Sequence, residues 1–169
     1  MVYAARILLI WLLCLLSVLF HELGHALGYR LTAGKVKWTI LAGSGPKIIN
    51  TAKYTFCLIP AGGYFAPEEE PGTKRAILAT LAGGPLVSLL QTVLYCICHF
   101  CFSGSLAQGT ALYEILVPVS RFLLFFNFFQ FFFTIIPIRY RVVCRGSESD
   151  GLRIVRALKH ERTQQQTRN

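Results

Sequence analysis

The chain is short, apolar and basic. Its 169 residues are 54% hydrophobic and 15% charged, and 17 Lys and Arg stand against 8 Asp and Glu. This composition argues against a soluble domain and is typical of an integral membrane protein, and the length leaves room for one folded unit. We therefore expect one membrane-embedded domain over residues 1–160 and a polar tail over 161–169.

Three apolar segments are long enough to cross a bilayer. A hydrocarbon core of about 30 Å requires about 20 helical residues at about 1.5 Å each. A cleaved signal peptide is the alternative for the first segment, but that segment is long and has few charges before it. The predicted spans cover residues 4–31, 76–102 and 111–138.

The loop after the first span has the pattern of a β-hairpin. Two stretches rich in aromatic and β-branched residues, "KVKWTIL" at 35–41 and "KYTFCLI" at 53–59, flank "GSGPK" at 43–47. Glycine, serine and proline in that order are typical of a turn. We therefore expect a small hairpin that reverses at 43–47.

The last segment begins at Asp150 and mixes apolar and basic residues at helical spacing. It predicts a short surface helix. The fold class expected from these elements is a mainly α membrane protein. It has about three transmembrane helices, a small β-hairpin after the first helix and a short C-terminal surface helix.

The charges predict the orientation. Residues 30–75 contain seven basic and three acidic residues, residues 139–169 contain eight and three, and residues 103–113 contain none. Because Lys and Arg accumulate on the cytoplasmic side of membrane proteins, we expect both basic regions in the cytoplasm and the 103–113 loop outside. Contact with the lipid bilayer accounts for this charge, so we expect no nucleic-acid partner.

The stretch "HELGH" at 21–25 introduces ionisable groups into the first span. His21 and His25 are four residues apart, so a helix presents both imidazoles to one cation, with the Glu22 carboxylate beside them. In this H-E-x-x-H arrangement a metal acidifies water and the carboxylate accepts the proton. Each ionisable group costs about 2.5–3.5 kcal/mol on insertion scales, which favours a functional site over a structural histidine pair.

Two histidines do not complete a catalytic metal site, which usually has three protein ligands. Asp150 follows the third span on the same predicted side as His21, although it could instead cap the last helix. The cluster of Cys96, Cys98, His99 and Cys101 lies at the end of the second span that is predicted to be outside, far from His21. The candidates are Asp150, Glu148, His160, His99 and the cluster of Cys96, Cys98, His99 and Cys101.

Polar residues recur at helical spacing within each span. Such faces turn toward the interior of a bundle, where they form either a polar crevice beside the metal or a structural hydrogen-bonding seam. The residues are Ser17, His21, Gly24, His25 and Gly28 in the first span, Gly84, Ser88, Gln91 and Tyr95 in the second, and Ser120, Asn127, Gln130 and Thr134 in the third.

Four stretches together resemble the site-2 protease family of intramembrane zinc metalloproteases, in its minimal form without an added substrate-selecting domain. "HELGH" is similar to the metal motif of the first core span and "IPAGGY" at 59–64 to its glycine-containing loop. "LAGGPLVSLL" at 81–90 is similar to the motif of the second span. "NFFQFFFTIIP" at 127–137, followed by "SDGL" at 149–152, is similar to the motif of the third.

This resemblance implies a Zn²⁺ site and a protease. His21, His25 and Asp150 would be the zinc ligands and Glu22 the general base. A transmembrane or membrane-associated protein would be the substrate. Apart from the resemblance, we expect the hairpin near residues 36–41 to hold the opened substrate chain by edge pairing. The bacterial plasma membrane is the location implied by small members. The implied substrate-binding residues are Gly62, Gly63, Gly84, Ser88, Asn127 and Thr134.

The chain also departs from the family pattern. Ser88 and Thr134 stand where relatives usually have asparagine, and twelve residues separate Pro137 from Asp150, more than in the commonest form. A catalytically inactive binding protein of the same fold is therefore one alternative function. The other is a metal or haem carrier, which would use the histidines but would not require Glu22.

Overall fold

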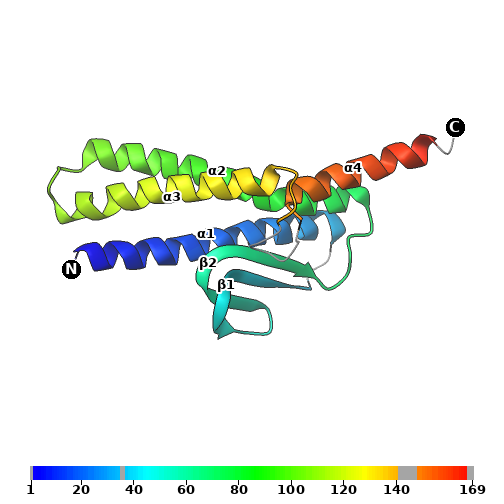
Figure 1. Cartoon of the computed structure of the whole chain (residues 1–169), viewed down its shortest axis with the longest axis horizontal. Helices are drawn as coiled ribbons and strands as arrows, with labels where there is room; N and C mark the ends of the chain where they lie inside the picture. Colours follow the sequence, from blue (N-terminus) through cyan, green and yellow to red (C-terminus); the bar gives the residue numbers. More distant parts are fainter. Residues whose placement is uncertain (1, 35–36, 141–147, 167–169) are drawn as a thin grey trace.

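The computed structural model describes residues 2–34, 37–140 and 148–166, and for 160–166 it describes the backbone alone. The chain is mainly helical, with one small sheet beside the first helix (Figure 1). This confirms the predicted fold class. The elements are α1 (Val2–Ala33), β1 (Trp38–Asn50), β2 (Tyr54–Pro67), α2 (Lys74–Ser105), α3 (Ala111–Ile135) and α4 (Asp150–Gln166).

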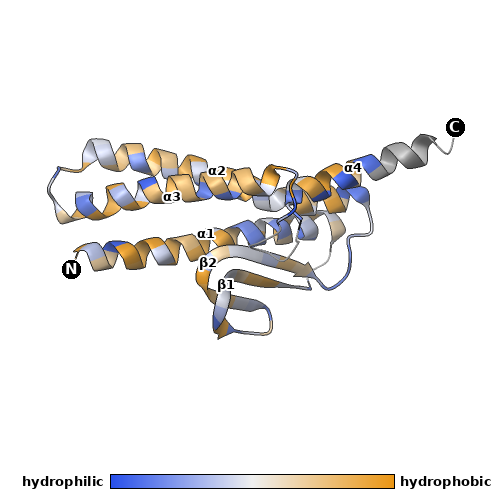
Figure 2. Ribbon diagram, viewed as in Figure 1, coloured by the Kyte–Doolittle hydropathy of each residue, from blue (hydrophilic) through white to orange (hydrophobic). Residues whose placement is uncertain are grey.

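The three predicted spans correspond to α1, α2 and α3, of 32, 32 and 25 residues, which are long and apolar enough to cross a membrane. Figure 2 shows apolar residues along most of their length. Helix α3 ends three residues before the predicted boundary. Proline disfavours helical backbone in the residue before it, and Ile136, which precedes Pro137, is extended (φ −66°, ψ 132°).

The loop predicted to be outside and the C-terminal region predicted to be cytoplasmic lie at opposite ends of the molecule. The N terminus and the α2–α3 connection are at one end, and α4 and the C terminus are at the other (Figure 1). The backbone of α4 is helical to Gln166. The division of the chain at residue 160 therefore stays a prediction.

Helices α1 and α2 cross closely through small residues. A Cβ added to Gly24 or Gly83 would collide with the backbone carbonyl of the other glycine, and one added to Gly28 would collide with the Ala79 carbonyl. Small residues allow helix backbones to approach closely in membrane proteins. This contact brings the polar face of α1 against the N-terminal half of α2.

The hairpin reverses at a different place from the one predicted. β1 continues through "GSGPK", where Gly43 (φ +88°) and Gly45 (φ +82°) bend it, and the reversal to β2 lies at residues 51–53. Positive φ angles suit glycine, which has no Cβ to clash. The prediction of a hairpin is confirmed, but the predicted turn is a bend within its first strand.

The pairing register narrows the expected substrate-binding edge, and substrate binding near residues 36–41 stays a prediction. Ile40, Leu41 and Ala42 each pair with two residues, one on either side, so the middle of this strand is already satisfied. By contrast, Gly63 and Tyr64 of β2 pair only with Ala42 and Leu41, and residues 61–64 are exposed. Trp38 and Thr39 of β1 also pair on one side only, so an open and exposed backbone edge lies at Gly63 and Tyr64 of β2 as well.

The sheet packs along α1. Ile40 and Phe65 form a buried cluster with Ala26 and Tyr29 of the helix. Farther toward the N terminus of α1, the Trp11 indole donates a hydrogen bond to the Leu58 carbonyl (2.7 Å). The sheet thus covers the side of α1 that neither α2 nor α3 occupies (Figure 1).

Candidate metal centre

The three polar residues of "HELGH" lie inside the protein. His21, Glu22 and His25 are 4%, 5% and 6% exposed. Gly84 of α2 lies directly against the two histidines, because a Cβ there would collide with His25 and would lie 2.7 Å from His21 Nε2. The absence of a side chain at residue 84 makes the room for both imidazoles.

Helix α2 also orients the two rings. His25 Nδ1 lies 2.8 Å from the Thr80 carbonyl oxygen, and His21 Nδ1 lies 2.8 Å from Ser88 Oγ. A carbonyl oxygen can only accept, so His25 Nδ1 donates and the Nε2 atom of the neutral ring presents a lone pair. Supporting hydrogen bonds of this kind fix the tautomer and direction of metal-binding histidines.

Asp150, the first residue of α4, completes a compact group. Its Oδ2 atom lies 3.4 Å from His25 Nε2 and 3.6 Å from His21 Nε2. One ligand atom from each of the three residues lies within 4.8 Å of the others. In the sequence Asp150 is more than a hundred positions from either histidine, and the end of α3 brings it to them.

The negative charge of the Asp150 carboxylate must be balanced by a positive charge close to it. Burial alone would raise the pKa of the Asp150 carboxyl, but the two imidazoles beside it outweigh burial and hold the pKa below its usual range. The carboxyl is therefore ionised at neutral pH, facing two ring nitrogens. Either a proton on an imidazole or a metal ion can balance this arrangement.

The distances fit a metal better than a proton. A charge-assisted N–H···O hydrogen bond spans about 2.7–2.9 Å, which is shorter than the 3.4 and 3.6 Å observed. A tetrahedral zinc site with bonds of about 2.0–2.1 Å places its ligand atoms about 3.3–3.4 Å apart. Two imidazoles and a carboxylate are also a donor set that zinc accepts. The three residues thus fit a zinc ion.

Glu22 lies beside this group and against the open edge of β2. A Cβ added to Gly63 would collide with the Glu22 carboxylate and would lie 2.8 Å from its Cγ and Cδ atoms. The glycine therefore allows the strand backbone to approach the carboxylate. Gly62, with φ +72°, bends β2 immediately before this contact.

Asn127 and Thr134 are engaged elsewhere among the described residues. The Asn127 amide donates to Ser17 Oγ (3.3 Å) and to the Leu123 carbonyl (2.8 Å), and its Oδ1 atom is buried without a hydrogen-bond partner. The Thr134 hydroxyl bonds to carbonyls of its own helix. Their predicted role in binding substrate stays a prediction.

The alternative third ligands lie apart from the histidine pair or outside the described residues. His99 bonds to Ser120 Oγ (3.3 Å) near the far end of α2, and the neighbouring cysteines are free thiols. Glu148 is paired with Arg139 (2.9 Å). The side chain of His160 falls outside the described residues.

Sequence reasoning missed two supporting residues. Thr80 acts through its backbone carbonyl, which no side-chain pattern identifies. Ser149, rather than Asp150, caps α4, because its Oγ accepts from the Leu152 amide (3.2 Å). A serine directly before the helix is a common capping signal. Because Ser149 caps the helix, the Asp150 side chain is left to face the histidines.

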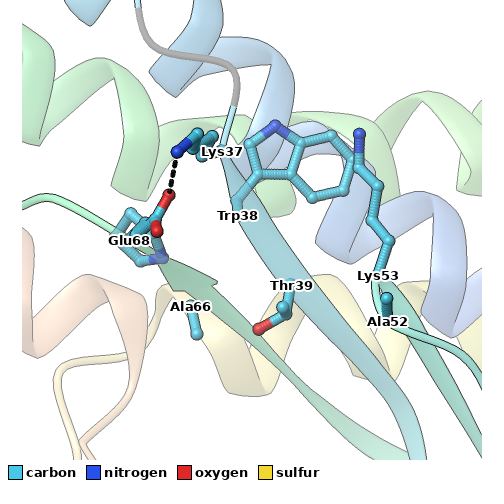
Figure 3. A pocket seen from close by; sticks show the side chains of 8 residues that line it. Lys37, Trp38, Thr39, Ala52, Lys53, Ala66 and Glu68 are labelled. Carbon is cyan, nitrogen blue, oxygen red and sulfur yellow. Dashed lines mark ion pairs between the residues drawn. The ribbon is translucent and has the colours of Figure 1, made fainter.

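The protein also has a hollow of about 460 Å³ between the ends of the strands, lined by Lys37, Trp38, Lys53 and Glu68 among others. In Figure 3 the Lys37 ammonium points to the Glu68 carboxylate (3.6 Å), and the Lys53 side chain reaches the Trp38 ring (3.8 Å to its centre). Neither the predicted zinc ligands nor Glu22 lines this hollow.

Comparison with known proteins gives one match. The family model described as Peptidase family M50 matches residues 9–167, nearly the whole chain. No curated protein and no solved structure matches. The matched range includes α1 from residue 9 onward, the sheet, α2, α3 and all of α4, and therefore every residue of the histidine and aspartate group. The chain belongs to peptidase family M50, the site-2 protease family of membrane-embedded zinc metalloproteases.

Proposed function

We propose that this protein is an active protease that binds one Zn²⁺ ion through His21, His25 and Asp150. It hydrolyses peptide bonds of membrane-spanning or membrane-associated proteins near the cytoplasmic face. The observation that carries the proposal is the convergence of two imidazoles and a carboxylate within 4.8 Å, from helices at opposite ends of the sequence. A site of this kind usually has three protein ligands and one open position.

Glu22 is the proposed general base. Zinc, when bound, supplies the electrophile that polarises the scissile carbonyl and acidifies water. Glu22 accepts the proton of the attacking water and later delivers it to the nitrogen of the leaving amine. Its contact with Gly63 supports this role, since the carboxylate borders an exposed backbone rather than a packed side chain.

The open edge of β2 is the proposed place where substrate is held. A membrane-spanning helix hides its amides in its own hydrogen bonds, so it must unwind locally before a bond is accessible. Residues 61–64 are exposed, and Gly63 and Tyr64 pair on one side only, which leaves backbone groups for an extended segment. An added strand gains main-chain hydrogen bonds along such an edge. Gly63 lies within that edge, beside Glu22.

The proposed position of the site is the cytoplasmic edge of a bacterial plasma membrane. Gly151 packs against the Ile135 carbonyl, at the last residue of α3, so Asp150 lies level with the end of a span. The excess of Lys and Arg in residues 30–75 and 139–169 supports the cytoplasmic assignment of that end. The bacterial location follows from the family resemblance alone.

Removal and return of the metal test the proposal. Protein purified from the membrane should contain about one zinc ion per chain, and a chelator should abolish cleavage of a panel of fluorescence-labelled single-span peptides reconstituted in vesicles. Stoichiometric zinc should restore it, because the three ligands form one site. Metal analysis and peptide mass spectrometry provide the two readouts. Metal-free protein that cleaves these peptides at the full rate would contradict the proposal.

A Gly84→Ala substitution should weaken zinc binding. The new methyl group would collide with His25 and crowd His21. We expect zinc affinity to fall about 10- to 100-fold, as it does when the support of a ligand is disturbed. Competition with a chromophoric chelator measures the change.

Gly104→Ala is the matched control for that substitution. It lies in the same helix, and nothing lies within 4 Å of the added Cβ. Its zinc affinity should equal that of the wild type. Equal affinity in both variants would exclude Gly84 from the ligand cradle.

A further inference from the structure

The connection between α3 and α4 is longer than in the commonest family form, yet Asp150 lies beside the histidines. The two ends of this connection, residues 138–139 and 148–149, are hydrogen-bonded to each other. Arg139 and Glu148 form an antiparallel bridge, and the Ser149 amide donates to the Ile138 carbonyl (3.0 Å). The chain thus returns to the end of α3 before Asp150 begins α4.

Glu148 joins three parts of this junction. One of its carboxylate oxygens accepts from Arg139 Nε (3.0 Å) and from the Arg156 guanidinium of α4. Its side chain is only 20% exposed, whereas those of Arg139 and Arg156 are 61% and 49% exposed. A carboxylate that is largely buried and shared by two guanidinium groups fixes the positions of its partners better than an isolated surface ion pair does. Glu148 therefore fixes the start of α4 and its direction.

Ser149 makes a second connection, directly before Asp150. Its buried hydroxyl donates to the Ile136 carbonyl (2.6 Å) and accepts from the Ile138 amide (3.1 Å). The same oxygen caps α4 through the Leu152 amide (3.2 Å). One side chain thus joins the end of α3 to the first turn of α4.

We propose that Glu148 and Ser149 are positioning residues that hold Asp150 against His21 and His25. The inference rests on the proposed function, because it assumes that this group binds zinc. We call Arg139, Glu148, Ser149 and Arg156 the clasp. Without the clasp, only the chain itself and the packing of Gly151 on Ile135 would hold the start of α4 to α3. The Asp150 carboxylate would then be fixed in place only when zinc binds.

The test measures zinc affinity and zinc dissociation in the full-length purified protein. Glu148→Gln and Ser149→Ala should each lower the affinity about 10- to 100-fold and speed dissociation. Ser149→Thr, which keeps a hydroxyl, should restore much of the loss. A double-mutant cycle tests the pair of Arg139 and Glu148. The double variant Arg139→Gln, Glu148→Gln should lose no more zinc affinity than Glu148→Gln alone, because each substitution breaks the same ion pair.

Glu114→Gln is the matched control. Glu114 pairs with Arg6 (3.6 Å) and accepts no contact from the clasp. Its zinc affinity should match that of the wild type. Thermal unfolding of the metal-free variants distinguishes positioning from folding, since a positioning role lowers zinc affinity more than it lowers the unfolding temperature. If Ser149→Ala does not fold, the less buried Glu148→Gln still tests the inference.

The outcomes separate the inference from the proposed function. Wild type that binds zinc, with clasp variants of equal affinity, would overturn the positioning role and leave the protease proposal standing. The same holds if affinity falls only in proportion to the loss of folded protein. Wild type that binds no zinc would overturn both.

Discussion

A Glu22→Gln protein is expected to keep its zinc and to lose cleavage. Glutamine has the size of glutamate but cannot accept a proton, so the proposed base is removed while the three ligands remain. General acid and base groups contribute about 10²- to 10⁴-fold to rate, and we expect a loss of that size in kcat/KM. Zinc content and cleavage of reconstituted single-span peptides, measured on the same preparation, check the two halves of the prediction.

The result is specific only if zinc is retained. Glu114→Gln, at an acid in another span, should keep both zinc and activity. Glu22→Asp keeps a carboxylate but withdraws it from Gly63, and it should retain a small part of the activity. A Glu22→Gln protein with full zinc and wild-type cleavage would remove Glu22 from the mechanism. A metal carrier would instead bind zinc and cleave nothing, even with Glu22 in place.

The spans and the histidine pair could be predicted because their signals are local. Apolar length alone determines that a helix can cross the bilayer, and the spacing of His21 and His25 places them on one helix face. The start of α4 at Asp150 was likewise apparent from its residues. These features depend on neighbours within one or two turns, which the sequence shows directly.

The hairpin could be predicted only in outline. The aromatic and β-branched residues of the two strands predict that a hairpin forms. Gly43 and Gly45, however, are equally compatible with a hairpin turn and with a bend inside a strand. The choice depends on packing against α1, which draws both strands along the helix. For the same reason, the paired state of Ile40 to Ala42 could not be read from the sequence.

The environment of the candidate site depended on contacts that are distant in sequence. Ser88 was singled out as a polar residue within a span, but its bond to His21 requires the close crossing of α1 and α2. The twelve residues between Pro137 and Asp150 looked like a departure from the family form. The bridge between Arg139 and Glu148 closes that connection at its base.

An Asp150→Ala protein is expected to lose zinc. Two imidazoles alone do not complete a catalytic zinc site, so affinity should fall by more than the 10- to 100-fold typical of a lost supporting residue. Zinc at about 100 times its Kd adds about 2.7 kcal/mol to the stability of a protein that binds it only when folded. The variant should therefore lose the zinc-dependent rise in unfolding temperature that the wild type shows.

Glu70→Ala provides the control, since it removes an exposed acid that is not part of the group of His21, His25 and Asp150. Zinc content and unfolding with and without zinc, measured for wild type and both variants, give the comparison. Asp150→Ala with wild-type zinc content would mean that another residue is the third ligand, with Glu148 or His160 the next to substitute. Because Glu148 is already bound by two guanidinium groups, we expect its carboxylate to stay with the clasp and Asp150→Ala to be metal-free.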